Sequence, residues 1–391
     1  MKTGRGRALA GGLAGILVTG IAAAGPLTGP TKVTVDKEGR LVLNGRPFFP
    51  IGLYSVPKDK LEHARQLGFN TVHTYSGEGS AKKDTAASPE KMKVWLDEAA
   101  KLGLYAWVGL PRHQIKTKQL GRLADRVKLL KDSPSLLFWY LFDEPKLQGV
   151  SADAMMAIAD KVREVDPDHP RILAPYRNPK GYLEIPDVLM TWAYSVRAKN
   201  SDLRPVGKQI RTMRRLVADK KPVWSVIQLH GKGPGGKGYG YLEPNLAQVR
   251  NMTYQAIAAG CRALTFFTYR GSQFNLEESK QGQKNARQIT SELRTLTPIL
   301  LGAHPKSPPY TVGGANLQRT FLARDGRLYL LVVNTSYGAA KVTVSARGVA
   351  LPAEVARVLG HDKVKTDGAT FSESIEALGV RWYELPSPGG K

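Results

Sequence analysis

Residues 136–145 read LLFWYLFDEP, and the organisation of the whole chain follows from this run. Seven apolar residues in succession, after a Ser-Pro-Ser turn, are typical of a strand that is buried on both faces in a parallel sheet. Asp143 and Glu144 come at the carboxyl end of this strand, where α/β barrels and doubly wound sheets place their chemistry. Pro145 ends the strand, and the alternative interpretation is an acidic pair that caps the next helix.

Strands and helices alternate on both sides of this run. Apolar segments predict eight strands, at residues 48–55, 70–76, 104–111, 136–142, 171–178, 187–195, 222–230 and 262–271. Amphipathic segments predict helices between them, except between residues 178 and 187, where the segment is too short and one crossover is reduced. This alternation over roughly 260 residues predicts an α/β fold, the (β/α)8 or TIM barrel. A doubly wound open sheet is the alternative, although no glycine-rich phosphate fingerprint follows the first strand.

The predicted barrel covers residues 48–303 and has a different segment on each side. Residues 25–47 are predicted to form short strands that lead into the barrel. Residues 304–391 begin as a proline-rich linker and continue as short alternating strands, among them residues 327–333, 340–345 and 380–385, which predict a small antiparallel β-sandwich. The sandwich sequence shows no concentrated cluster of titratable residues, so we expect this domain to pack on the barrel. Glycan binding is an additional role that it could have.

Residues 1–24 have the three parts of a secretory signal peptide: a basic start, an apolar run and a small-residue cleavage site. A membrane anchor is the alternative, but this run is short and weakly apolar for a spanning helix. No later segment approaches 18 uninterrupted apolar residues. We therefore expect a secreted protein, periplasmic or extracellular, that has no membrane span after signal cleavage.

Lysine and arginine total 57 against 33 aspartate and glutamate residues, so the chain of 391 residues has a formal net charge of +24. Residues 1–24 contribute three of these positive charges and no negative one, which leaves +21. Such a surplus favours acidic partners, among them anionic glycans. The basic residues are spread over predicted helix faces, without a basic arm or an RNA-binding strand motif. We therefore expect no nucleic-acid partner.

Neither a cofactor nor a metal is predicted. The single cysteine, Cys261, excludes an internal disulfide, and no HExxH motif, paired cysteines or aspartate-rich calcium loop occurs. Residues 231–238, GKGPGGKG, match part of the phosphate-loop pattern but lack the final Ser or Thr that would hold Mg²⁺.

If the barrel is correct, the carboxyl ends of its strands meet at one site, which we call the mouth. The side chains expected there are mainly aromatic, with several hydrogen-bond donors and one carboxylate pair. Sugars present apolar ring faces and many hydroxyl groups, so this set suits a carbohydrate substrate. The residues expected to bind substrate are Tyr54, His73, Tyr75, Trp107, Arg112, Trp192, Tyr194, Gln228, His230, Tyr269 and Arg270. His113 and residues 176–178 are expected at the same end.

Three segments of the sequence resemble one known family. They are residues 44–52, NGRPFFPIG, before the first strand, Asp-Glu-Pro after the fourth, and Pro-Val-Trp at residues 222–224. They are similar to retaining glycoside hydrolases of the large (β/α)8 clan, especially uncharacterised secreted members with a β-sandwich after the barrel. The similarity covers about residues 32–390. It implies a glycosidase that cleaves an O-glycosidic bond in a poly- or oligosaccharide.

The resemblance implies that Glu144 is the general acid/base, because the clan places this group at the end of the fourth strand. The clan has an Asn before it, where this chain has Asp143, which could accept a hydrogen bond from a sugar hydroxyl. The clan's nucleophile is a Glu that ends the seventh strand, where this chain has Gln228. An amide is not an ionised nucleophile, so this position departs from the clan.

A second carboxylate would then have to come from a loop. The candidates are Glu78, Glu243, Glu277 and Glu278, and Glu243 is preferred because it follows a glycine-rich loop that carries Tyr239 and Tyr241. A substrate-assisted route would remove this need, but it requires an acetamido sugar. The alternative function is a catalytically silent barrel that binds glycans.

Overall fold

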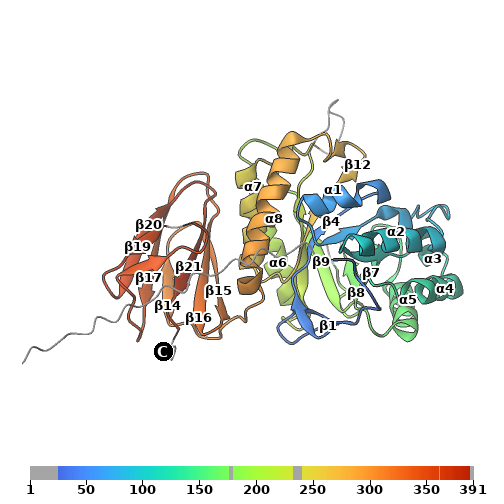
Figure 1. Cartoon of the computed structure of the whole chain (residues 1–391), viewed down its shortest axis with the longest axis horizontal. Helices are drawn as coiled ribbons and strands as arrows, with labels where there is room; N and C mark the ends of the chain where they lie inside the picture. The colour runs from blue at the N-terminus through green and yellow to red at the C-terminus, as the bar shows by residue number, and fades with distance from the viewer. Residues whose placement is uncertain (1–24, 176–178, 232–239, 361, 388–391) are drawn as a thin grey trace, which may run out of the picture.

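The computed structural model describes residues 25–175, 179–231, 240–360 and 362–387. In this part of the chain, eight parallel strands close into a barrel in the order β10-β11-β4-β5-β6-β7-β8-β9 (Figure 1). The predicted (β/α)8 barrel is therefore confirmed. The predicted signal peptide, residues 176–178 and most of the glycine-rich loop lie outside the described residues. The barrel strands are β4 (Ile51–Leu53), β5 (Thr71–His73), β6 (Tyr105–Gly109), β7 (Leu136–Asp143), β8 (Arg171–Ala174), β9 (Val188–Trp192), β10 (Val223–Gln228) and β11 (Leu264–Phe267).

Strand β7 is buried over its first seven residues, as its apolar sequence predicts. Its side chains divide between two cores, because successive residues of a strand point to opposite faces. Phe138 and Tyr140 belong to the core inside the barrel, whereas Trp139 and Leu141 belong to the layer between the barrel and its helices. The packed strand therefore fixes the position of Asp143, its last residue, at the mouth.

Helices surround the barrel, and serine side chains cap the start of α2 and of α5. The side chain of Ser88 accepts a hydrogen bond from Lys91 N at 3.4 Å, and that of Ser151 accepts one from Ala154 N at 3.2 Å. No helix lies between β8 and β9 in the described residues, in agreement with the reduced crossover. The helices are α1 (Leu61–Gln66), α2 (Pro89–Lys101), α3 (Arg112–Lys116), α4 (Leu120–Leu130), α5 (Ala152–Val165), α6 (Pro205–Leu216), α7 (Leu246–Ala258) and α8 (Lys280–Leu300).

A small antiparallel sheet closes the end of the barrel opposite the mouth. It consists of β1 (Val33–Val35), β2 (Leu41–Leu43) and β3 (Arg46–Phe48), in that order. Apolar side chains of β1 and β2 belong to the core inside the barrel. The barrel is thus filled and covered at this end.

The chain ends in a β-sandwich, which also confirms the predicted architecture. One sheet has the order β14-β17-β20 and the other β15-β16-β21. The sandwich packs beside α7 and α8 (Figure 1), where the Asn251 side chain donates hydrogen bonds to Asn334 O at 2.8 Å and Leu378 O at 2.9 Å. The strands are β14 (Tyr310–Gly313), β15 (Leu317–Arg324), β16 (Arg327–Asn334), β17 (Ala340–Ala346), β18 (Glu354–Ala356), β19 (Lys363–Lys365), β20 (Thr370–Ile375) and β21 (Val380–Leu385).

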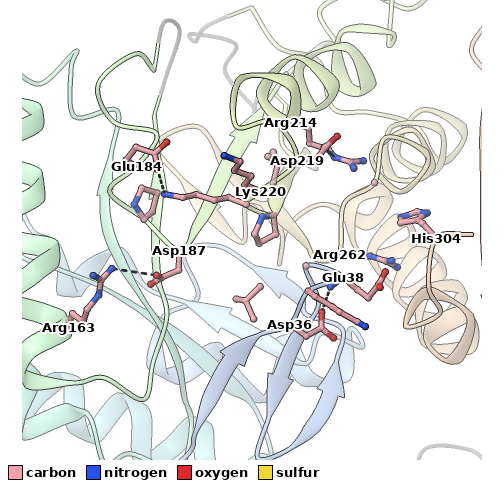
Figure 2. Close-up of a pocket in the computed structure, with 18 residues that line it drawn as sticks. Asp36, Glu38, Arg163, Glu184, Asp187, Arg214, Asp219, Lys220, Arg262 and His304 are labelled. Carbon is pink, nitrogen blue, oxygen red and sulfur yellow. Dashed lines mark hydrogen bonds and ion pairs between the residues drawn. The ribbon is translucent and has the colours of Figure 1, made fainter. Parts of the chain in front are cut away.

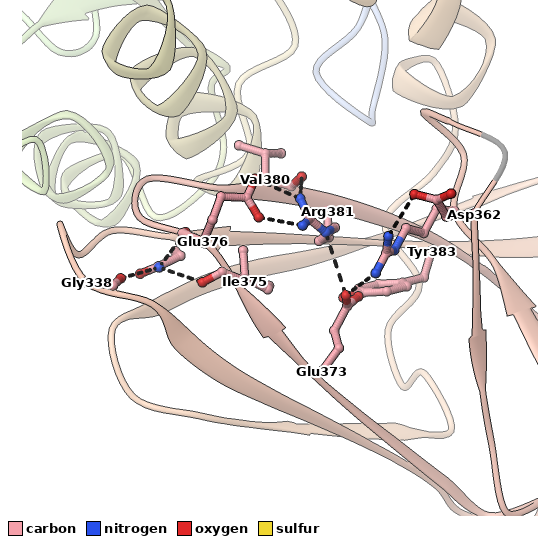
Figure 3. Close-up of polar contacts among 10 residues, drawn as sticks. Gly338, Asp362, Glu373, Ile375, Glu376, Val380, Arg381 and Tyr383 are labelled. Carbon is pink, nitrogen blue, oxygen red and sulfur yellow. Dashed lines mark hydrogen bonds and ion pairs between the residues drawn. The ribbon is translucent and has the colours of Figure 1, made fainter.

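The sandwich contains a polar cluster that the sequence analysis missed (Figure 3). Glu373 accepts hydrogen bonds from Arg357 and from the hydroxyl of Tyr383, and its carboxylate lies 3.7 Å from Nε of Arg381. Since β20 and β21 belong to different sheets, this cluster joins the two sheets. The expectation that the domain has no concentrated titratable cluster was wrong, because strand pairing brings together residues that are separated in sequence.

Candidate functional site

The candidate site lies at the mouth, where β7 delivers Asp143 and Glu144. Glu144 has a φ of 54°, in the left-handed region that non-glycine residues seldom occupy and that is often found at functional sites. This backbone conformation interrupts the regular alternation of a strand, so the two acids are not forced to opposite faces. Burial is the main cause of the raised pKa of Tyr194, and the negative charges of Asp143 and Glu144 raise it further. Both acids therefore act on the same wall of the mouth.

Asp143 has the most perturbed carboxylate at the mouth. Its Oδ1 accepts a hydrogen bond from the hydroxyl of Tyr140 at 3.1 Å, and its Oδ2 lies 3.7 Å from Nη2 of Arg112. Burial raises the pKa of Asp143 to about 7, and the negative charge of Glu78 adds to the effect, while Arg112 opposes it. Burial also raises the pKa of Glu144. Such acids can hold and release a proton near neutral pH.

Glu78 lies behind this pair and holds Arg112 in place. Its Oε2 accepts hydrogen bonds from Nε of Arg112 at 2.9 Å and pairs with Nη2 at 2.8 Å, and its Oε1 lies 2.9 Å from Nε2 of His73. The Glu78 side chain is only 3% exposed. Burial lowers the pKa of His73, so its imidazole is neutral near pH 7 and donates Nε2–H to Glu78. Both carboxylate oxygens are thus engaged, and Glu78 supports Arg112 without facing the mouth.

Aromatic rings form the wall beside the carboxylates. Tyr194 stacks on Phe267 with ring centroids 5.6 Å apart, and Tyr54 meets Phe267 edge-on at 5.7 Å. Tyr75 lies 5.8 Å below the guanidinium of Arg112, which is a cation–π distance. Trp192 lies 6.5 Å from Tyr194. Tyr75, Trp192, Tyr194 and Phe267 are partly exposed, so they can present ring faces to a ligand.

A cavity of about 140 Å³ continues this wall on the side of β10 and β11. His230, Tyr241, Phe267 and Phe274 are among the residues that line it. Nδ1 of His230 lies 3.0 Å from the carbonyl oxygen of Phe267, so it donates a hydrogen bond there. Burial lowers the pKa of His230 to about 4, so Nε2 of the neutral ring is an acceptor. This volume is below the roughly 300 Å³ of pockets for drug-sized ligands and suits one small ring.

Several residues expected to bind substrate are buried beneath the mouth. Tyr54, His73 and Trp107 are at most 2% exposed and pack together inside the barrel. They support the mouth rather than line it. The expectation that they contact substrate through exposed faces was therefore wrong, because the barrel interior is filled by side chains.

The side chains of Gln228 and Tyr269, which were also expected to bind substrate, are hydrogen-bonded to other groups of the protein. The Gln228 amide is fully buried, accepts from Val196 N at 2.9 Å, and donates to Val196 O at 3.2 Å, His230 O at 3.1 Å and Leu242 O at 3.1 Å. It joins the loops after β9 and β10. Tyr269 is buried against α1, with its hydroxyl 2.8 Å from Nδ1 of His63. Neither side chain is free for a substrate, which corrects both expectations.

Glu243 and Glu277 make their contacts with other groups than the carboxylate pair. Glu243 accepts a hydrogen bond from Ser279, the N-cap of α8, and so belongs to the start of that helix. Glu277 binds Nζ of Lys60 at 2.6 Å and lies 3.9 Å from Arg270, which is exposed. The preference for Glu243 as the second carboxylate therefore finds no support in its contacts.

A larger hollow of about 610 Å³ lies at the opposite end of the barrel (Figure 2). Its charged side chains are largely paired, as in Arg163–Asp187 at 3.8 Å and Arg214–Asp219 at 2.7 Å. It is bordered by the segments that enter the strands, whereas barrel enzymes act at the carboxyl ends. We therefore place the candidate site at the mouth.

Two further properties bear on function. Among the residues that the structure describes, no group of three or more His, Cys, Asp or Glu side chains is arranged to hold a metal ion. In the same residues, no helix is both long and apolar enough to cross a bilayer.

The fold is shared with glycoside hydrolases of known structure, whereas no protein-family model and no curated protein sequence matches the chain. A family 5 glycoside hydrolase from Bacteroides vulgatus superposes with a TM-score of 0.62 at 15% identity, over 91% of this chain and 93% of that one. An α-amylase from Geobacillus thermoleovorans, in complex with acarbose, gives a TM-score of 0.59 at 10% identity, over 84% and 91% of the two chains. A family 27 β-L-arabinopyranosidase from Geobacillus stearothermophilus gives 0.59 at 12% identity, over 88% and 97%. At these identities the likeness establishes the architecture, a (β/α)8 barrel followed by antiparallel β-sheets, that this chain shares with glycosidases.

Proposed function

We propose that the protein is a secreted glycoside hydrolase in which Asp143 and Glu144 are the acids that act on the glycosidic bond. The observation that carries this proposal is the pair of carboxylates with raised pKa values at the end of β7, beside partly exposed aromatic rings. The shared fold agrees with it. A single strand thus supplies both acids, and neighbouring strands supply the sugar-binding wall.

The two acids differ in how they are held. Asp143 is fixed by Tyr140 and Arg112, whereas Glu144 is half-buried. The pKa of about 7 is that of Asp143, and the charge of Glu144 contributes to it, so the two carboxylates titrate as a pair that retains a proton up to neutral pH. We assign this proton to Glu144 during turnover, where it passes to the leaving-group oxygen, while Asp143 provides the negative charge beside the sugar.

The test is a screen of glycan hydrolysis with matched variants. Wild-type protein, the Asp143→Asn/Glu144→Gln double variant and a Glu277→Gln control would be incubated with plant, bacterial and chitin-derived oligosaccharides, and reducing ends would be counted. Glu277 is an exposed acid of a neighbouring loop, so its replacement should leave turnover unchanged. We expect hydrolysis by the wild type and the control, and a loss of at least about a hundredfold in the double variant. A folded double variant with full turnover would refute the proposal.

The alternative function, a barrel that binds glycans without cleaving them, is favoured by one observation. Gln228 stands where the clan has its nucleophile, and its amide is fully used by the backbone. If the wild type binds an oligosaccharide of the screen and cleaves none of them over days, the binding function replaces the catalytic one.

A further inference from the structure

The positions of all acids in the chain limit the mechanism that a glycosidase could use at the mouth. No aspartate or glutamate lies outside the described residues, so every carboxylate can be placed. The acids whose charges act most strongly on Asp143 are Glu78 and Glu144. Glu78 is excluded as a reacting group, because both of its oxygens are occupied and its side chain is 3% exposed. Asp143 and Glu144 are thus the reacting acids available.

Asp143 and Glu144 are consecutive residues, so their side chains leave the backbone at neighbouring positions on one wall of the mouth. Consecutive Cα atoms are about 3.8 Å apart, and the charges of both acids reach Tyr194. The usual two-carboxylate mechanism instead places the acids on either side of the scissile bond, with one attacking or activating water from the opposite face. In this barrel the position for an opposing nucleophile is held by Gln228, which is fully buried.

We infer, on the basis of the proposed function, that the attacking group is supplied by the substrate and that the sugar cleaved by this protein carries a 2-acetamido group. Such a sugar needs one proton donor and one carboxylate beside its acetamido nitrogen, and these can lie on the same side of the mouth. The geometry of Asp143 and Glu144 meets this need, because Asp143 is fixed by Tyr140 and Arg112 while Glu144 remains free to donate.

The reaction then balances without any further group. The acetamido carbonyl oxygen attacks C1, the C1–O bond to the leaving group breaks, and the leaving oxygen takes the proton of Glu144. The positive charge of the resulting five-membered ring, which includes the N–H, is stabilised by the Asp143 carboxylate. Water next adds to C1, gives a proton to Glu144, and the C1 bond to the acetamido oxygen breaks. The products are the free acetamido sugar and the alcohol.

The surroundings of Asp143 suit this group. Burial is the main cause of the raised pKa values of Tyr54, Tyr75, Tyr140 and Tyr194, and the charge of Asp143 raises each of them further. The Asp143 carboxylate therefore lies among tyrosine side chains. Of these four, Tyr75 and Tyr194 are partly exposed, so their ring faces provide an apolar surface for the acetamido methyl group and their hydroxyl groups can hold the carbonyl oxygen. Glu78, Asp143 and Glu144 outnumber Arg112 at this site, so the local charge favours a cationic intermediate despite the basic surface of the chain.

The experiment compares substrates that differ only at C2. The acetamido oxygen must attack from the face opposite the leaving group, so the probes are fluorogenic β-N-acetylglucosaminide, β-N-acetylgalactosaminide and chitotetraose, against the corresponding β-glucoside, β-galactoside and cellotetraose. We expect at least about a hundredfold higher turnover on one acetamido probe than on its matched sugar. A thiazoline analogue of N-acetylglucosamine should bind wild-type protein at least about a hundredfold more tightly than N-acetylglucosamine itself, since it resembles the intermediate. Asp143→Asn should abolish this difference in calorimetry, which needs no turnover.

Other outcomes separate this inference from the proposed function. Glu144-dependent hydrolysis of the matched sugars at equal rates would overturn the acetamido inference and leave the glycoside hydrolase in place. Equal binding of the thiazoline and N-acetylglucosamine would overturn it as well. If no glycoside of either series is cleaved and the thiazoline is not bound, both the inference and the proposed function are wrong.

Discussion

Arg112 is the cation on which the mouth depends, and replacing it by Met should destabilise the fold strongly. Two of its nitrogens lie 2.9 Å and 2.8 Å from Glu78 Oε2, and Nη2 lies 3.7 Å from Asp143. Arg112→Met would leave Glu78, which is 3% exposed, as a buried charge without its cation. Removing one partner of a buried pair costs about 3–5 kcal/mol, so we expect a loss of that size in the free energy of unfolding.

Urea denaturation at pH 7 measures this loss, and Arg122→Met is the matched control. Arg122 also faces a carboxylate, Asp84, at 3.5 Å, but its side chain is 69% exposed. Surface pairs contribute about 0–1 kcal/mol, so the control should lose less than 1 kcal/mol. Similar losses in the two variants would refute the view that Arg112 neutralises a buried charge.

The pH dependence of the Arg112→Met loss gives a second check. The pKa of Asp143 is already raised to about 7, and Arg112 opposes this rise, so the pKa of Asp143 should rise further in Arg112→Met. A carboxylate with a raised folded pKa costs stability as the pH rises through the interval between the two pKa values. The part of the loss that is due to charge on Asp143 should therefore grow as the pH rises from about 6 to about 9. A loss that is constant over this range would mean that packing, and not charge, causes it.

Three other expectations concern the contacts of single residues. Turnover should fall above about pH 7, because the Asp143–Glu144 pair then loses its proton, and a pH–rate profile that is flat to pH 9 would contradict this. Gln228→Glu should lower the melting temperature without raising turnover, because a carboxylate cannot donate hydrogen bonds to the carbonyl groups that the amide binds. A gain in turnover would mean that a silenced clan-type site had been restored. Asn251→Ala should loosen the sandwich from the barrel at a cost of about 1–3 kcal/mol, seen as faster proteolysis between the domains, and unchanged proteolysis would show that this contact is dispensable.

The sequence was informative where a pattern depends on neighbours along the chain. The apolar run of β7 predicts a buried strand, and the alternation of strands and helices predicts the barrel, because burial and periodicity are local properties. The same logic places Asp143 and Glu144 at the mouth. The predicted sandwich strands at residues 327–333 and 380–385 agree with β16 and β21 to within one residue.

The sequence was less informative where a side chain depends on the loops around it. β11 ends at Phe267, four residues before the predicted end at 271, so Phe267 lines the mouth while Tyr269 turns towards α1. Phe267 could have been found only by knowing where the strand ends. Glu243 looked suitable because its loop carries tyrosines, but Ser279 from a distant helix start binds it. The engagement of Glu78 likewise depends on His73 and Arg112, which come from other elements of the barrel.

The role of Glu144 as proton donor can be tested through the leaving group. A general acid is needed when the departing oxygen is a poor leaving group, and it matters little when that group is a stabilised phenolate. Turnover of folded Glu144→Gln protein should therefore be measured on an unactivated oligosaccharide and on the dinitrophenyl glycoside of the same sugar. We expect a loss of at least about a hundredfold on the oligosaccharide and a much smaller loss on the dinitrophenyl glycoside. Equal losses on both substrates, or no loss on either, would contradict the assignment of Glu144 as the proton donor.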